Sequence, residues 1–265
     1  MRTLAVIPAR LGATRLPRKP LRILAGLPLV IRVWERVLSL DVVDRCLIAT
    51  DSDEVAEIVN EYGAEVVMTS DEHRSGTDRI AEVALRREYA DYDVIVNVQG
   101  DEPFVPRSAI TGAVRLVTDG RFSLGTAAVR AEPSVLRDPN IVKVVAAHDG
   151  RAMYFSRAPI PYLRDAEDAP VQRPLIWQHI GVYAYTRQAL LQWVSLPPHP
   201  LELVERLEQL RPLAHGIRIG VADLSAAPER GIDTEEDLTR ANTRWLEFEA
   251  NNSHRAPLTP TPSTA

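Results

Sequence analysis

Residues 4–21 read LAVIPARLGATRLPRKPL. The first four residues are all apolar, which is typical of a buried strand in a parallel sheet. The loop that follows is too rich in proline to be a helix, and it carries four cationic side chains within ten residues: Arg10, Arg15, Arg18 and Lys19. Open α/β sheets bind ligands at the carboxyl ends of their strands. This junction therefore predicts an α/β fold and the position of a ligand site.

Apolar runs alternate with segments of helical period through the first half of the chain. Such alternation predicts crossover helices on a doubly wound, mostly parallel sheet. We expect strands at residues 4–7, 46–50, 65–68 and 94–98, and helices at residues 29–40, 53–62 and 77–89.

The second half has strand patterns with little helix between them, at residues 124–129, 141–147, 151–156 and 176–185. This succession predicts an antiparallel, β-rich insertion. Helical patterning returns at residues 201–213, followed by a strand at 217–222 and a final helix at 234–249. We expect an α/β domain of residues 1–130 and 211–250, an insertion of residues 131–210, and a disordered tail of residues 251–265, whose composition cannot bury a core.

Composition excludes several classes of protein. The 265 residues are 45% hydrophobic, enough for one or two globular domains. Neither a run of about 18 apolar residues nor a signal peptide occurs, so we expect no membrane partner and a cytoplasmic location. A net charge of -5 with 6% aromatics argues against a nucleic-acid partner. The single cysteine, Cys46, lies in an apolar run and is expected to be buried.

The two common nucleotide fingerprints, G-x-G-x-x-G and G-x-x-x-x-G-K-[ST], are both absent. In their place, Arg10, Arg15 and Lys19 are suited to neutralise a triphosphate through charge-assisted hydrogen bonds. Gly12 would allow a tight backbone in the same loop. The alternative is a solvated basic loop.

Two aspartates are candidate metal ligands. Asp101 follows the apolar strand 94–98, which ends at the same sheet edge as the basic loop, and a carboxylate beside a triphosphate is the usual ligand of Mg²⁺. Asp233 lies in the segment GIDTEEDL. The alternatives are structural: Asp101 as a turn residue, and Asp233 as the residue before a helix capped by Thr234 and Asp237.

The predicted strand 176–185 suggests a second binding surface. Its two-residue period places His179, Gly181 and Tyr183 on one face, with His179 and Tyr183 roughly 13 Å apart and room for a ligand between them. The alternative is a hydrogen-bonded core histidine. Arg157 follows another apolar strand and is either a surface cation or a clamp for a carboxylate.

Taken together, the chain resembles the 3-deoxy-manno-octulosonate cytidylyltransferase family over about residues 1–245. The resemblance rests on motifs in a fixed order: IPARLGATRLPRKPL, ATDSDEVAEIV, HRSGTDRIAEV, VNVQGDEP, PNIVKVV, YFSRAPIP, QHIGVYAY, LELVERLEQLR and GIDTEEDL. It implies a nucleotidyltransferase that joins CTP to an acidic eight-carbon sugar, giving a CMP-sugar for lipopolysaccharide assembly and pyrophosphate. It also implies direct in-line displacement, with the insertion supplying the sugar site. The family and the β-rich insertion favour a homodimer, but an exposed sheet edge is also compatible with a monomer.

The resemblance also assigns residue roles. Arg10, Arg15, Lys19 and Asp101 are the expected catalytic residues. The expected nucleotide site adds Gly12, Ser75, Gly76, Asp78 and Gln99. Mg²⁺ would bind Asp101 and Asp233. The expected sugar site comprises Gln99, Arg157, His179, Tyr183, Glu208 and Gln209, although the last two also fit a helix surface.

One position departs from the family. Many members have glycine where this chain has Arg18, whose side chain either reaches the γ-phosphate or points into solvent. Other functions remain open: a transferase for a sialic acid or an 8-amino octulosonate, one using a different nucleotide, or a non-catalytic nucleotide-sugar binding protein. The missing glycine fingerprint disfavours a nicotinamide-dependent oxidoreductase. Pyrophosphate release from CTP without a redox cofactor separates these classes.

Overall fold

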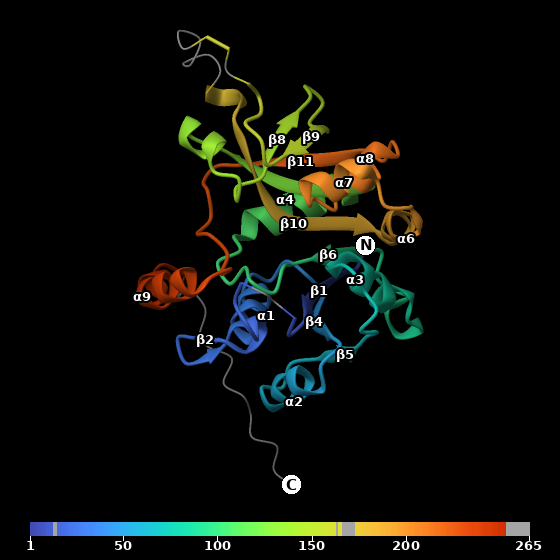
Figure 1. The fold of residues 1–265 in the computed structure, drawn as a ribbon. Coiled ribbons are helices and arrows are strands. Elements are labelled where there is room, and N and C mark those ends of the chain that lie inside the picture. The colour runs from blue at the N-terminus through green and yellow to red at the C-terminus, as the bar shows by residue number, and fades with distance from the viewer. Residues whose placement is uncertain (13–14, 163, 166–172, 253–265) are drawn as a thin grey trace.

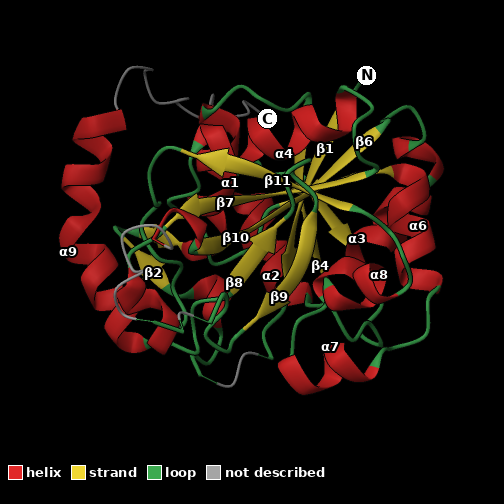
Figure 2. Ribbon diagram, turned by 90° about the horizontal axis from the view of Figure 1, so that it is seen from above, coloured by secondary structure: helices red, strands yellow, loops and turns green. Residues whose placement is uncertain are grey.

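A mixed, nine-stranded sheet forms the centre of the computed structural model (Figures 1 and 2). The structure describes residues 1–12, 15–162, 164–165 and 173–252. The main strand order is β11-β7-β10-β6-β1-β4-β5. The strands are β1 (Thr3–Ala9), β4 (Arg45–Thr50), β5 (Val66–Met68), β6 (Val94–Asn97), β7 (Leu124–Arg130), β10 (Trp177–Thr186) and β11 (Ile219–Leu224). Strands β5, β4, β1 and β6 run parallel, as the apolar runs of the first half predict.

Helices cover both faces of this sheet, as the sequence predicts for a doubly wound fold. One core contains residues of α1 (Leu29–Ser39), α2 (Asp53–Glu61), α4 (Arg107–Thr118) and α9 (Glu235–Asn252). The other contains residues of α3 (Gly76–Leu85) and α6 (Arg187–Ser195). Hydroxyl caps start two of the expected helices: Ser52 accepts from Val55 N, and Ser75 accepts from Asp78 N.

The predicted helix 77–89 ends at Leu85, because Arg86 adopts an extended conformation before the 3-10 turn Arg87–Tyr89. Helices α4 and α6 were not predicted. In α4, Gly112 and β-branched residues weaken the helix signal, yet a Cβ at Gly112 would lie 2.7 Å from Ala222 Cβ, so close packing against β11 requires glycine there. The short strands β2 (Ile23–Leu24) and β3 (Leu27–Pro28) form a separate hairpin.

The boundary predicted at residues 131–210 does not separate an independent layer. Strand β10 lies inside the main sheet and pairs antiparallel with both β6 and β7. Only β8 (Lys143–Ala146) and β9 (Ala152–Ser156) extend away from that path, with β8 joined to β10. The strand patterns were correct, but a central antiparallel strand has the same sequence period as one in an insertion.

The predicted helix 201–213 is two short helices. The first, α7 (Pro200–Glu205), ends at Arg206, which has a left-handed φ of 55°, and the second is α8 (Leu210–Ala214). Two further 3-10 turns are Pro133–Arg137 and Arg173–Leu175. Cys46 is buried as predicted, and burial raises the pKa of its thiol.

The predicted tail lies almost wholly outside the described residues, since Asn251 and Asn252 are the last residues of α9 and residues 253–265 are not described. Among the described residues, none of the helices combines the length and the apolar character needed to cross a membrane.

Candidate active site

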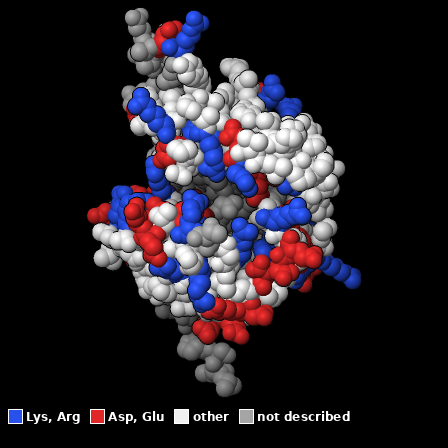
Figure 3. All heavy atoms as spheres, in the orientation of Figure 1, with Lys and Arg blue, Asp and Glu red and all other residues white. Residues whose placement is uncertain are grey.

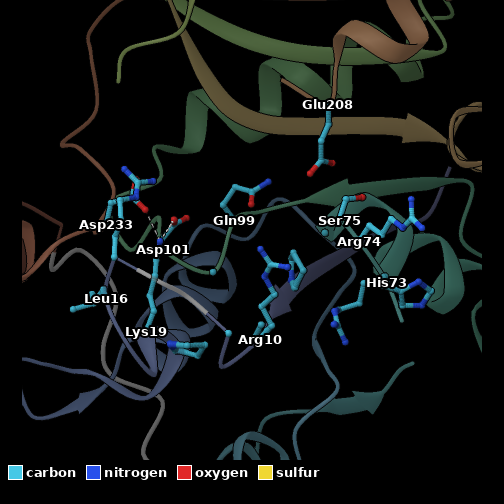
Figure 4. A pocket seen from close by; sticks show the side chains of 18 residues that line it. Arg10, Leu16, Lys19, His73, Arg74, Ser75, Gln99, Asp101, Glu208 and Asp233 are labelled. Atoms are coloured by element: carbon cyan, nitrogen blue, oxygen red, sulfur yellow. Dashed lines mark hydrogen bonds and ion pairs between the residues drawn. The ribbon is translucent and has the colours of Figure 1, made fainter. Parts of the chain in front are cut away.

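A cavity of about 380 Å³ lies where the loops after β1 and β6 meet the start of α3 and the loop before α9 (Figure 4). Ten residues expected from the sequence line it: Arg10, Gly12, Arg15, Lys19, Ser75, Gly76, Gln99, Asp101, Glu208 and Asp233. The carboxyl ends of β1 and β6 therefore form the site, as expected for an open α/β sheet.

Lys19 joins the two aspartates. Its Nζ donates one hydrogen bond to Asp101 and another, of 2.7 Å, to Asp233 Oδ1 (Figure 4). Arg15 donates a hydrogen bond of 3.0 Å to Asp233 Oδ2 from a more exposed position. Burial alone would lower the pKa of Lys19, but the two carboxylates outweigh it and raise that pKa. Two acidic groups from distant parts of the chain thus converge on one cation.

Asp233 also precedes a capped helix, as the structural alternative predicted, and this position is compatible with its contact to Lys19. Asp237 caps the start of α9, where its carboxylate accepts hydrogen bonds from Thr234 Oγ1 at 2.9 Å and from the backbone N–H of Asp233 at 3.2 Å. Because the backbone of Asp233 makes the helix contact, its carboxylate is left to face Lys19 and Arg15.

The remaining cations of the loop differ in their surroundings. Arg10 is exposed, lines the cavity, and forms no hydrogen bond or ion pair with any described residue. Arg18 pairs with Glu54 of α2 and does not line the cavity. Its φ of 57° lies in the left-handed region that favours glycine, the residue that the resemblance leads us to expect at this position.

Among the described residues, a close approach that requires glycine occurs at Gly100 rather than at Gly12. A Cβ at Gly12 would meet no atom within 4 Å, whereas a Cβ at Gly100 would lie 2.9 Å from the carbonyl oxygen of Pro8. At Gly100 the loop after β6 thus approaches β1 closely enough to require glycine. The sequence signal was the Gly-Asp pair at the end of the predicted strand.

The N-terminus of α3 forms the opposite wall. Ser75 caps the helix through Asp78, whose backbone N–H donates to Ser75 Oγ at 3.1 Å. Ser75 and Gly76 line the cavity, whereas Asp78 does not. Thr77 Oγ1 donates a hydrogen bond of 2.9 Å to Glu208, which also lines the cavity. Burial raises the pKa of Glu208.

Three cavity residues in the HRSGTDR motif were not singled out from the sequence. The buried Arg79 donates a hydrogen bond of 2.6 Å to Asp51, and His73 Nε2 lies 2.6 Å from Glu82 Oε2. The third, Arg74, is exposed. His73 and Arg74 gave no separate signal, because loop residues before a helix have no fixed period, and the buried Arg79 lies within α3, where its charge would suggest a surface position.

A second cavity, of about 470 Å³, shares Arg15, Asp101 and Asp233 with the first. Its other walls include Asn140, Ile141, Val142, Gln178, His179, Gly181 and Arg230. Glu102 also lines this cavity, and burial, together with the charge of Asp101, raises its pKa to about 8. The two cavities thus meet at the aspartate pair.

The gap predicted between His179 and Tyr183 does not exist. The register of β10 against β7 shifts between Ile180 and Tyr183, and the rings of His179 and Tyr183 have centroids only 5.5 Å apart. A bulge breaks the two-residue period and turns one side chain towards the other. Tyr183 is buried against Tyr185 and Trp193 and lines neither cavity.

His179 lines the second cavity and has the hydrogen bond expected of a core histidine, with 2.9 Å between its Nε2 and Thr126 Oγ1. Burial lowers the pKa of its ring to about 3. Both interpretations made from the sequence therefore apply to this side chain: it has a core partner, and it borders a cavity.

Two other expected sugar residues lie apart from both cavities. Arg157 donates to the carbonyl oxygens of Glu205 and Pro139, each at 3.0 Å. Gln209 is buried, so the helix-surface alternative for it is wrong. Neither lines a cavity in the described part of the chain.

Comparison with known proteins identifies relatives of this chain. The cytidylyltransferase family model matches residues 4–219. The chain is 63% identical to the 3-deoxy-manno-octulosonate cytidylyltransferase of Gemmatimonas aurantiaca, over 96% of this chain and 98% of the relative. It is 43% identical to the corresponding protein of Actinobacillus pleuropneumoniae serotype 7, over 89% and 96% of the two chains.

Two solved structures of cytidine-nucleotide transferases have the same fold as this chain. The structure of a CMP:2-keto-3-deoxy-manno-octonic acid synthetase complexed with CTP matches with a TM-score of 0.85 and 35% identity, covering 93% of this chain and 99% of that one. The inositol-1-phosphate CTP transferase from T. maritima matches with a TM-score of 0.65 and 17% identity, which shows the fold alone.

Proposed function

The chain belongs to the 3-deoxy-manno-octulosonate cytidylyltransferase family, and from this premise we propose that it transfers CMP from CTP to the anomeric 2-hydroxyl of 3-deoxy-manno-octulosonate. The products are CMP-3-deoxy-manno-octulosonate, for lipopolysaccharide biosynthesis, and pyrophosphate. The observation that carries this proposal is the convergence of Arg15, Lys19, Asp101 and Asp233 at the junction of two cavities. One cavity suits the nucleotide and the other suits the sugar.

The first cavity is the proposed nucleotide site. Arg10 has no protein partner among the described residues, so its guanidinium is available to the phosphates. Arg15 and Lys19 would exchange their carboxylate contacts for phosphate oxygens. At the opposite wall, Ser75 and Gly76 would lie against the cytosine and ribose, with Gln99 between the nucleotide and the sugar.

A divalent ion, Mg²⁺ in our proposal, would bind Asp101 and Asp233. Among the described residues there is no cluster of three or more His, Cys, Asp or Glu side chains suited to hold a metal. Two carboxylates nevertheless fit Mg²⁺, because this ion takes one or two carboxylates and completes its shell with substrate phosphates and waters. The Lys19 ammonium already lies where a cation between the two carboxylates is favourable. When bound, the ion would withdraw charge from the α-phosphate.

The reaction is proposed to be a direct in-line displacement. The sugar 2-hydroxyl attacks the α-phosphorus, the bond to the β-phosphate oxygen breaks, and pyrophosphate leaves. The chain's contribution is to orient the two substrates and to neutralise the phosphates with Arg10, Arg15 and Lys19. No covalent intermediate with the protein is required.

The sugar is proposed to enter the second cavity, which borders the aspartate pair. His179 and Arg230 line this cavity and offer a hydrogen-bonding ring and a cation for an acidic sugar. For Tyr183 and Gln209 the proposed contribution is packing beneath the site, because both are buried. Arg157 and Glu208 remain candidate ligands from the resemblance, with Glu208 on the nucleotide side of the junction.

We also propose a cytoplasmic homodimer. CTP is a cytoplasmic nucleotide, which favours that location. Exposed apolar side chains occur on the part of the molecule beyond the main sheet, with Leu203 of α7 57% exposed, Val204 of α7 82% exposed and Met153 of β9 57% exposed. A second copy of the chain is the partner we expect to cover them. Sedimentation equilibrium tests this: Val204→Glu should yield a monomer, and a monomeric wild type would contradict the proposal.

A pyrophosphate-release assay that crosses four nucleoside triphosphates with several acidic sugars tests the function. We expect turnover with CTP and 3-deoxy-manno-octulosonate, and little with UTP, because a site that pairs with the cytosine amino group leaves its acceptors unsatisfied when uracil binds. Preferred turnover of a sialic acid or an 8-amino octulosonate would replace the proposed sugar. Comparable turnover with UTP would contradict the proposed nucleotide.

A further inference from the structure

Thr126 lies at the centre of a polar cluster in the middle of β7. Its side chain is fully buried, and its Oγ1 lies near three polar atoms of β10. Those atoms are the carbonyl oxygen of Val182 at 2.7 Å, the carbonyl oxygen of Ile180 at 3.3 Å and Nε2 of His179 at 2.9 Å. The two carbonyls flank Gly181, where the register of β10 shifts. Thr126 thus holds the bulge and contacts the histidine at the same time.

Counting protons in this cluster determines the state of the histidine. A hydroxyl has one proton to donate, and the two carbonyl oxygens are only acceptors. The contact with Val182 is the shorter of the two and takes that proton. With that proton on the Val182 carbonyl, the lone pairs of Thr126 Oγ1 face Nε2, and the 2.9 Å contact is a hydrogen bond only if Nε2 carries a hydrogen. Burial keeps the ring neutral at neutral pH, since it lowers the pKa of His179 to about 3. A neutral ring with its hydrogen on Nε2 has a lone pair on Nδ1.

The orientation of that lone pair is fixed by packing. The His179 ring lies edge-to-face with Phe155, with centroids 5.0 Å apart, and against Tyr183 at 5.5 Å. Within the described residues Nδ1 makes no hydrogen bond, while His179 lines the second cavity next to Gly181 and Asn140. Thr126 and the two aromatic rings thus hold the orientation of a ring that lines the second cavity.

We propose that Thr126 is a positioning residue that fixes His179 as the Nε2–H tautomer, so that Nδ1 accepts a hydrogen bond from a hydroxyl group of the sugar. This inference rests on the proposed function of the second cavity. It predicts which ligands this cavity prefers. A ligand with a hydroxyl donor can pair with Nδ1, whereas a ligand without one would leave that acceptor unpaired, which weakens binding.

The tautomer is tested directly by ¹⁵N NMR of the wild-type protein labelled at its six histidines, with His179→Gln to assign the signals. We expect a neutral His179 ring with the hydrogen on Nε2 and a bare Nδ1. A ring protonated on Nδ1, or on both nitrogens at pH 7, would overturn the proposal. This measurement needs no turnover, so it is independent of whether the sugar has been correctly identified.

The consequence for the sugar is tested with Thr126→Val, which keeps the shape but removes the hydroxyl, and with Thr126→Ser as the matched control. We expect Thr126→Val to raise KM for 3-deoxy-manno-octulosonate about tenfold, the effect of losing one hydrogen bond. KM for CTP should stay within about twofold, and Thr126→Ser should resemble wild type. Equal rises in both KM values, or no rise in either, would reduce Thr126 to a structural residue.

The two experiments fail in distinguishable ways. If Thr126→Val does not fold, the wild-type NMR result still decides the tautomer, and Thr126→Ser still tests whether a hydroxyl suffices. If the wild type releases no pyrophosphate with CTP and this sugar, the proposed function fails, whereas the tautomer of His179 stands or falls on its spectrum.

Discussion

Asp101 and Asp233 accept hydrogen bonds from the same ammonium group, that of Lys19. One aspartate follows β6 and the other precedes α9, so the fold alone brings them together. Two carboxylates at one point repel each other and any triphosphate unless a cation lies between them. The pair is therefore a site built for positive charge, which the lysine supplies in the absence of substrate.

This relationship predicts non-additive mutations. Asp101→Asn and Asp233→Asn keep the side-chain shape but remove a charged ligand, and each should lower kcat roughly 10²- to 10³-fold, as loss of one preorganised electrostatic contact does. If both carboxylates serve one ion, the double variant should be little worse than the poorer single variant. Steady-state kinetics of the four proteins at saturating CTP measure this. Multiplying losses would indicate two independent roles, and a near-wild-type Asp233→Asn would leave that residue as a helix-start residue only.

The same geometry predicts that Lys19 and a metal ion compete for the two aspartates. Lys19 competes with a divalent ion for the two carboxylates in the nucleotide-free protein, because both favour the same position. Replacing Lys19 by Met removes this competitor. We expect the free Lys19→Met variant to bind Mn²⁺ at least about tenfold more tightly than the wild type, since one ion-pair partner is worth about that factor. Mn²⁺ titration followed by electron paramagnetic resonance gives both constants.

Arg22→Met is a suitable control for that titration, because Arg22 pairs with Glu235, two positions beyond Asp233, and touches neither aspartate. It should leave Mn²⁺ binding unchanged. Equal Mn²⁺ affinities for the wild type and Lys19→Met would show that the Lys19 ammonium does not compete with the metal ion for the two aspartates.

Much of this site could be predicted from the sequence because its residues follow buried strands. The basic loop after β1 and the Gly-Asp pair after β6 lie at the carboxyl ends of parallel neighbours, and such ends converge whatever the rest of the fold does. Asp233 required the family resemblance, since its local pattern describes only a capped helix.

The geometry of the proposed sugar site could not be predicted, because it depends on pairing between distant strands. The bulge at Gly181 arises where β10 meets β7, and the Thr126 hydroxyl donates to the carbonyl oxygen of Val182 beside it. Nothing in the segment QHIGVYAY itself indicates that Thr126 of β7 will be its partner. A regular two-residue period was therefore the wrong model there, and the distance expected between His179 and Tyr183 was too long.

Arg18 offers a test of the loop's backbone. Its left-handed φ of 57° costs a non-glycine residue about 1 kcal/mol, while its ion pair with Glu54 is exposed and contributes less than about 1 kcal/mol. Arg18→Gly should therefore leave the free energy of unfolding unchanged or slightly raised. KM for CTP should also be unchanged, because the side chain points to α2. Arg18→Ala retains the strain and loses the pair, so it should be the less stable variant. A clear rise in KM for CTP with Arg18→Gly would give Arg18 a phosphate role.

The half-buried His179, whose pKa burial lowers, predicts how stability depends on pH. Its pKa is lowered to about 3 in the folded protein, against an ordinary value near 6.5, so the unfolded chain takes up a proton at a higher pH than the folded chain. Below pH 6.5 protonation thus favours the unfolded state, and the free energy of unfolding falls until the pH approaches 3. Between pH 7 and pH 5 this group alone should lower the free energy of unfolding by about 2 kcal/mol.

Urea unfolding of the wild type and His179→Gln at both pH values isolates this contribution. The free energy of unfolding of the wild type should fall by about 2 kcal/mol more than that of the variant. Tyr183→Phe is the control, since it disturbs the same ring cluster without removing the histidine, and it should keep the wild-type pH dependence. Parallel losses in the wild type and His179→Gln would mean that the ring takes up its proton in the folded protein, against the neutral state described above.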